Sequence, residues 1–138
     1  MILAEYFSYR LHRIGIATVL LGHDHEIAED LVDLTKDDVI IIFGFSKLNA
    51  TGSTILSYGH TMQTTNVLIT SCTMLPQAKL EDYLLTVDRG QANEFHSMTS
   101  AMALLDGLVV SVGAIKGEPA LNRMKSVHHL KHQLNQSD

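Results

Sequence analysis

Short apolar runs alternate with amphipathic stretches along most of the 138-residue chain. Four uncharged or nearly uncharged runs have the length and β-branched or aromatic content of strands, at residues 17–21, 39–43, 66–70 and 83–87. Elsewhere, apolar residues recur every three or four positions, which is typical of helices with one buried face. This spacing predicts helices at residues 3–14, 27–34, about 52–62, 94–114 and from 119 onward.

Strands that alternate with helices indicate an α/β fold with right-handed crossovers. We therefore expect a three-layer α-β-α sandwich with a mainly parallel, Rossmann-like or flavodoxin-like sheet, four strands of which lie in this chain. Residues 1–138 are expected to form a single domain. Gly15 is placed to cap the first helix, and the helix at 94–114 is apolar enough to be nearly surrounded by protein, so Met98 and Met102 are expected in the core.

Composition excludes several classes of function. The net charge of −5 provides no basic field for phosphate backbones, so the chain is not expected to bind nucleic acid. The single cysteine, Cys72, fits a reducing cytoplasm. No apolar run approaches the roughly 20 residues of a membrane span, and the first residues do not form a signal peptide. The charged fraction of 18% is low, which is compatible with a homo-oligomer that hides part of its surface.

The segment after the run at 39–43 offers the most suggestive chemistry. Ser46, Asn49 and Thr51 bring hydroxyl and amide groups to the start of a helix, where backbone N–H groups and the helix dipole suit an anion, and Lys47 adds positive charge. In open α/β sheets ligands bind at the carboxyl ends of the strands. The alternative is that Asn49 or Thr51 only caps the helix.

The remaining polar residues give weaker signals. Two histidine pairs have spacings that could in principle hold a metal, at positions 23 and 25 and at 128 and 132, but solvated polar faces explain both, and no metal or cofactor is expected. Glu94 and His96 could perform acid–base chemistry near a sugar. The favoured interpretation is that Glu94 complements a helix N-terminus, so no catalytic residue is assigned.

The run from Asp38 to Ser46, with the helix and the strand that follow it, resembles the sugar isomerase (SIS) domain, and most closely the SIS domain of RpiR-type transcriptional regulators. Further matching segments lie before and after this run, in the family's order along nearly the whole chain, at residues 4–7, 10–15, 34–38, 76–80, 99–100 and 104–108. The family's signature loop reads Ser-x-Ser-Gly-x-Thr. Of its defining residues only Ser46 is kept here, because Gly44, Lys47 and Asn49 stand at the other three positions.

The resemblance implies a parallel sheet that binds a phosphosugar, usually within dimers or larger assemblies. It places the ligand at Ser46, Lys47, Asn49, Thr51 and Glu94. The family's first strand and its DNA-binding domain are expected to be missing from this chain. The expected function is that of the sugar-phosphate sensor of a regulator and not of an enzyme. The alternatives are a dimerisation scaffold that binds no sugar, or an aldose–ketose isomerase with Glu94 or His96 as its base.

Overall fold

The structure is a computed structural model that describes residues 2–22, 27–71, 79–91 and 95–135. The chain divides into two compact units. Residues 21–101 form the first, which we call the sheet unit. Residues 1–20 and 102–138 form the second, which we call the helical unit.

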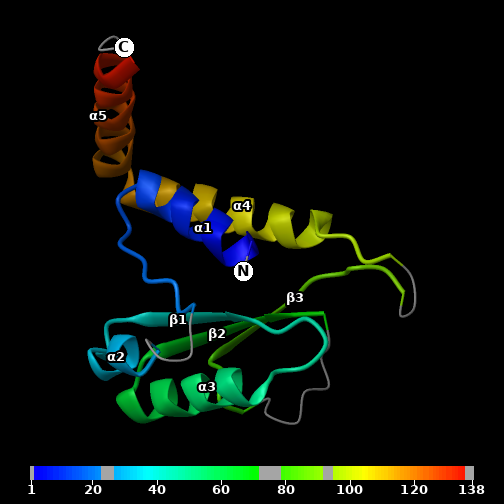
Figure 1. The fold of residues 1–138 in the computed structure, drawn as a ribbon. Coiled ribbons are helices and arrows are strands. Elements are labelled where there is room, and N and C mark those ends of the chain that lie inside the picture. Colours follow the sequence, from blue (N-terminus) through cyan, green and yellow to red (C-terminus); the bar gives the residue numbers. More distant parts are fainter. Residues whose placement is uncertain (1, 23–26, 72–78, 92–94, 136–138) are drawn as a thin grey trace. The chain divides into compact units, whose positions relative to one another are not determined.

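The sheet unit contains a three-stranded parallel sheet in the order β1-β2-β3 (Figure 1). Its strands are β1 (Val39–Phe43), β2 (Thr65–Thr70) and β3 (Tyr83–Thr86), and its helices are α2 (Ile27–Val32) and α3 (Ala50–Met62). In the β1–β2 register Val39 lies opposite Thr65, and in the β2–β3 register Val67 lies opposite Tyr83. The predicted α/β class and the parallel sheet are therefore confirmed.

The core of the sheet unit lies between α3 and one face of the sheet. Ile40 of β1 packs with Ile55 and Leu56 of α3, and all three side chains are buried. Partly buried apolar residues surround this cluster: Ile27, Leu31, Leu34, Ile42, Leu48 and Leu80. The inward placement of Leu31 and Leu34, which the helical spacing of residues 27–34 predicts, is thus confirmed, although α2 itself ends at Val32.

The expectation of four strands is wrong for the described residues, because residues 17–21 form no strand. This run has the apolar composition of a buried strand, but Val19 is 70% exposed and Leu20 is 46% exposed. A strand must pair its N–H and C=O groups with a neighbour, and the sheet of the described residues consists of β1, β2 and β3. The apolar composition of a segment therefore does not by itself predict a strand.

The helical unit contains α1 (Ile2–Arg13), α5 (Glu118–Asn135) and most of α4 (Thr99–Lys116). Gly15 follows α1 with φ +82°, and the N–H groups of Gly15 and Ile16 donate to the carbonyls of His12 and Leu11. This left-handed residue confirms the predicted glycine cap. Pro119 lies in the first turn of α5, where a proline costs the helix no hydrogen bond, and the helix predicted from residue 119 onward is confirmed.

Helix α4 is more exposed than its composition predicts. Val110 and Ile115 are exposed, and so is Met98 just before the helix, which corrects its assignment to the core. Among the described helices α4 alone is long and apolar enough to cross a bilayer, with a mean hydropathy of 1.4 over 18 residues, of which 17% are buried. The expectation that no run approaches such a length is therefore wrong. Core helices of water-soluble proteins also pass this test of length and composition.

A small polar turn leads into β1 and gives the sheet unit a pH dependence. The Asp38 carboxylate accepts hydrogen bonds from the backbone N–H and the hydroxyl of Thr35, both at 2.8 Å. These bonds hold the pKa of Asp38 below its ordinary value. Their stabilisation is therefore present above the unfolded-state pKa and is lost as the pH falls through the lower, folded-state pKa.

We expect the Asp38→Asn variant to melt below the wild type at neutral pH, by a small amount because the group is exposed. The difference in melting temperature will shrink as the pH falls below the ordinary pKa of an aspartate carboxyl and through the lowered pKa of Asp38 in the folded state, because the carboxylate is then protonated. Thermal melts of both proteins between neutral and acid pH measure this. Asp37→Asn is the control, because no described group bonds to the Asp37 carboxylate. A difference that is independent of pH would contradict this role of Asp38.

Candidate functional site

The carboxyl ends of the three parallel strands lie at one edge of the sheet (Figure 1). Residues 44–49 follow β1, Ser71 follows β2, and residues 87–91 follow β3. We call this edge, with its three connecting segments, the carboxyl edge. It is the position at which open α/β sheets bind ligands.

The segment after β1 is tied to the end of β2. The Gly44 N–H donates to the Ile69 carbonyl at 2.9 Å, and the Ser71 N–H donates to the Phe45 carbonyl at 3.2 Å. The Ser71 hydroxyl donates to the same Phe45 carbonyl. These bonds fix where the chain leaves the sheet, so the residues after Phe45 start from a defined position.

Ser46 and Lys47 lie at the exposed tip of this segment. Neither side chain forms a hydrogen bond or an ion pair with another described residue. Contact of these two side chains with a ligand stays a prediction.

Asn49 is the N-cap of α3. Its side-chain oxygen accepts a hydrogen bond from the Gly52 N–H at 2.8 Å, and its backbone is extended. The structure thus confirms the capping alternative for Asn49. A ligand contact through its remaining amide N–H groups stays a prediction. Thr51 is exposed in the first turn of the helix.

Gly52 allows the segment to pack closely on α3. A Cβ atom at this position would lie 2.7 Å from the Leu48 Cδ1 atom and 3.1 Å from the Asn49 side-chain oxygen. Leu48 in turn is partly buried against the core of the sheet unit. Glycine has a low helix propensity. At this position it leaves the space that Leu48 and the Asn49 side chain occupy.

Arg89 is the residue that sequence reasoning missed. It follows β3, and its guanidinium carbon lies 4.4 Å from the centre of the Phe45 ring, a cation–π contact between two segments of the carboxyl edge. Its Nε atom is buried and has no hydrogen-bond partner among the described residues. The backbone of Arg89 is also fixed, because the Ser97 N–H donates to the Arg89 carbonyl at 3.0 Å.

A signal for Arg89 was present in the sequence. Its position directly after a predicted strand, in residues 88–91, is the same reason for which Lys47 became a candidate. The composition of residues 88–91, with glycine close after aspartate, predicts a turn or loop. The turn is real, because the Asp88 carboxylate accepts from the Gly90 N–H at 2.9 Å, but it also directs a cation toward Phe45.

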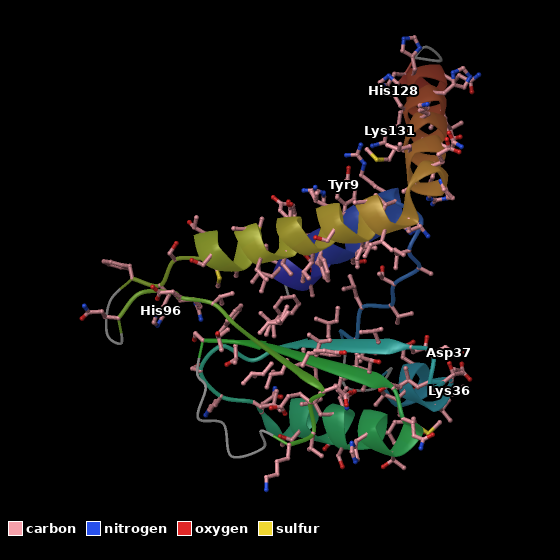
Figure 2. All side chains as sticks on the ribbon, turned by 180° about the vertical axis from the view of Figure 1, so that it is seen from behind. Tyr9, Lys36, Asp37, His96, His128 and Lys131 are labelled. Atoms are coloured by element: carbon pink, nitrogen blue, oxygen red, sulfur yellow. The ribbon has the colours of Figure 1, made fainter. Side chains whose placement is uncertain are left out.

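The other candidates receive less support. Glu94, His23, His25 and Cys72 lie outside the described residues. His96 is exposed on the segment that precedes α4 (Figure 2). His128 is exposed on α5, and no group of three or more metal-binding side chains occurs among the residues that the structure describes.

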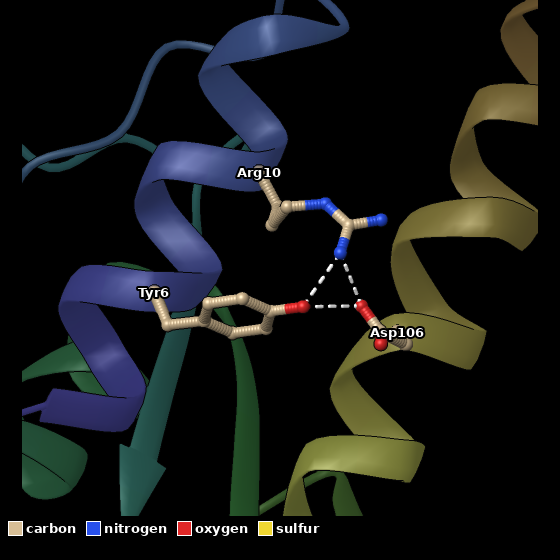
Figure 3. Close-up of polar contacts among 3 residues, drawn as sticks. All are labelled: Tyr6, Arg10 and Asp106. Atoms are coloured by element: carbon tan, nitrogen blue, oxygen red, sulfur yellow. Dashed lines mark hydrogen bonds and ion pairs between the residues drawn. The ribbon is translucent and has the colours of Figure 1, made fainter.

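A second polar cluster, in the helical unit, joins α1 to α4 (Figure 3). The Tyr6 hydroxyl donates to the Asp106 carboxylate at 2.6 Å, and the Arg10 guanidinium donates to the same carboxylate at 2.5 Å. The hydrogen bond to Asp106 raises the pKa of Tyr6. Because all three side chains satisfy one another, this cluster is an inter-helical contact, and we assign it no ligand.

Comparison with known proteins identifies the fold. No protein-family model and no curated protein matches the chain. Among solved structures, the sugar isomerase domain of an RpiR transcription factor from Sphaerobacter thermophilus superposes with a TM-score of 0.81 at 19% identity, over 93% of this chain and 72% of that one. The Vibrio vulnificus NanR protein complexed with ManNAc-6P gives a TM-score of 0.81 at 20% identity, over 96% and 52%.

A third solved structure has a similar fold. The c3406 protein of E. coli CFT073, in complex with a sugar phosphate, gives a TM-score of 0.67 at 19% identity, over 83% of this chain and 64% of that one. At these identities the likeness speaks for the fold and not for a shared activity. The chain has the fold of the sugar isomerase domain found in RpiR-type regulators.

Proposed function

We propose that this chain binds a phosphorylated sugar at the carboxyl edge and serves as the effector-sensing part of a cytoplasmic RpiR-type regulator, not as an enzyme. The observation that carries the proposal is the placement of Arg89 against Phe45, which brings a cation without a described ion-pair partner to the loop that holds Ser46 and Lys47. Two structures with this fold, NanR and the c3406 protein, are complexes with sugar phosphates, which supports a ligand of this kind.

The loop after β1 has fewer hydroxyl groups than the family's signature, and Arg89 can compensate for this loss. Gly44 and Asn49 stand where that signature has hydroxyl side chains. The side-chain oxygen of Asn49 already accepts the capping hydrogen bond of α3. An arginine offers several N–H donors to a phosphate and keeps its charge at any physiological pH. Arg89 thus supplies charge and donors that the shortened set of hydroxyls does not.

A thermal-shift experiment tests the proposal. Each sugar phosphate of a panel is compared with the same sugar without phosphate, and only the phosphorylated forms are expected to raise the melting temperature. The Arg89→Met variant should lose about ten- to a hundredfold in affinity, as expected for a charge-assisted hydrogen bond. Lys36→Met is the matched control, since it removes a cation before β1, outside the carboxyl edge, and should bind as the wild type does.

The alternatives give different results. No shift with any sugar phosphate would contradict binding and favour a scaffold that binds no sugar. Interconversion of an aldose and a ketose phosphate would overturn the assignment as a non-enzyme. Equal affinities of wild type and Arg89→Met would remove Arg89 from the site while leaving the ligand class in place.

A further inference from the structure

The Arg89 side chain is positioned by an aromatic ring. Its guanidinium carbon lies 4.4 Å from the centre of the Phe45 ring. No hydrogen bond or ion pair to a described residue fixes this side chain, since its Nε atom is buried without a partner and the ion pair of the described chain joins Arg10 to Asp106. An arginine side chain rotates about several bonds, so without the ring its charge would be spread over many positions.

The contact of Arg89 with Phe45 differs from the other cation–π contacts of the described chain. Two arginines of α1 lie near tyrosine rings one turn away on the same helix, at 5.6 Å and 6.0 Å from the ring centres. The attraction extends to about 6 Å, so the contact at 4.4 Å is the one well inside this limit. It also joins the segment after β1 to the segment after β3.

Phe45 is itself held in place, so its ring can support a neighbour. Its carbonyl accepts hydrogen bonds from the Ser71 N–H at 3.2 Å and from the Ser71 hydroxyl. Its ring lies 6.3 Å, centre to centre, from the ring of Phe43 in β1, with the two planes tilted by 45°. The ring thus has a defined position relative to the sheet, and this also defines the position of the guanidinium over it.

The second cation of the carboxyl edge has no such support. Lys47 is exposed, and its ammonium group forms no ion pair and no ring contact with a described residue. A ligand must order the flexible stem of a lysine when it binds, and this ordering lowers the affinity. Arg89 is already held over a fixed ring before the ligand arrives. Of these two cations, Arg89 is therefore the preorganised one.

We propose that Phe45 is a positioning residue of the phosphosugar site: its ring holds the Arg89 guanidinium where it contacts the anionic group of the ligand. Phe45 acts through Arg89 and not by touching the ligand itself. This inference rests on the proposed function, since it presupposes that a sugar phosphate binds at the carboxyl edge. It goes beyond that function because it assigns a role to an apolar side chain of the loop.

A double-mutant cycle at positions 45 and 89 tests the proposal. Calorimetric titrations use inorganic phosphate and the sugar phosphate of the panel that raises the wild-type melting temperature most. Phe45→Leu removes the ring face and should weaken binding by about two- to thirtyfold, the range of a cation–π contact. Phe45→Tyr keeps the ring and should bind as the wild type does. In an Arg89→Met background, Phe45→Leu should cause no further loss, because the two residues act as a unit.

A spectroscopic signature and a control separate this role from a purely structural one. Protons above the face of an aromatic ring resonate upfield, so the Arg89 side-chain signals of the unliganded protein should be shifted in the wild type and in Phe45→Tyr but not in Phe45→Leu. Phe95→Leu is the matched control, because it removes a ring that is fully exposed and should leave affinity unchanged. Circular dichroism checks folding, and Phe45→Met replaces Phe45→Leu if that variant does not fold.

The outcomes distinguish this inference from the proposed function. If the wild type binds a sugar phosphate and Phe45→Leu binds it equally tightly, the inference alone is overturned. The same holds if Phe45→Leu weakens binding as much in the Arg89→Met background as in the wild type, or if the Arg89 signals do not depend on the ring. If the wild type binds no sugar phosphate, the proposed function fails, and the inference fails with it.

Discussion

Replacing Asn66 with leucine is expected to lower the free energy of unfolding of the sheet unit by about 2–4 kcal/mol, although the two side chains are similar in size. Asn66 lies in β2 and is fully buried. Its side-chain amide donates to the carbonyls of Leu56 at 3.1 Å and Leu80 at 2.8 Å. Its oxygen accepts from the Thr64 hydroxyl at 3.0 Å.

The size of this effect follows from the groups left behind. Leucine would leave the Thr64 hydroxyl and the Leu80 carbonyl without their partners, and a buried polar group without a partner costs about 1–3 kcal/mol. Urea unfolding followed by circular dichroism measures the change. Asn122→Leu is the control, because Asn122 is exposed on α5, and it should change stability by less than about 0.5 kcal/mol. Similar midpoints for Asn66→Leu and the wild type would show that the network stabilises nothing.

The second large effect is expected for Gly59→Ala in α3. A Cβ atom at this position would lie 2.5 Å from the Ile40 Cδ1 atom, 2.6 Å from the Asn66 side-chain oxygen and 2.8 Å from the Thr64 hydroxyl. Alanine improves helix propensity by about 1 kcal/mol, but overpacking at a buried site costs typically 1–3 kcal/mol. Because the extra methyl group also presses on the Asn66 network, we expect a net loss of about 1–3 kcal/mol.

The same substitution at Gly107 provides the control. Gly107 lies inside α4, and a Cβ atom there meets nothing within 4 Å. Gly107→Ala is therefore expected to leave stability unchanged or to raise it by up to about 1 kcal/mol. Urea midpoints of both variants measure the difference. If the two substitutions shift the midpoint in the same direction and by the same amount, the close contact at Gly59 has no energetic consequence.

The strands were predictable where their partners lie in the described chain. The uncharged runs at 39–43, 66–70 and 83–87 correspond to β1, β2 and β3 within one residue at each end. The run at 17–21 has similar apolar content but forms no strand in the described part of the chain, and a local pattern carries no information about distant partners. The role of Asn66 was equally hidden, because it depends on carbonyls of residues ten and fourteen positions away.

The site was predictable only in part. The position of a strand end, together with the polar residues after it, identified Ser46 and Lys47, and the cap preference of asparagine anticipated the role of Asn49. Arg89 became a candidate only when β3 aligned its carboxyl end with that of β1, and when the guanidinium was found over Phe45. Such a contact joins residues 44 positions apart in the sequence, which spacing arguments do not reach.

Amide chemical-shift mapping tests the central claim most directly. A sugar phosphate is titrated into the isotopically labelled chain and followed by two-dimensional NMR. We expect the largest shifts at the amides of residues 45–49, Ser71 and 88–90, with the same sugar lacking phosphate producing none. Shifts confined to other parts of the chain, or no shifts with any sugar phosphate, would contradict binding at the carboxyl edge.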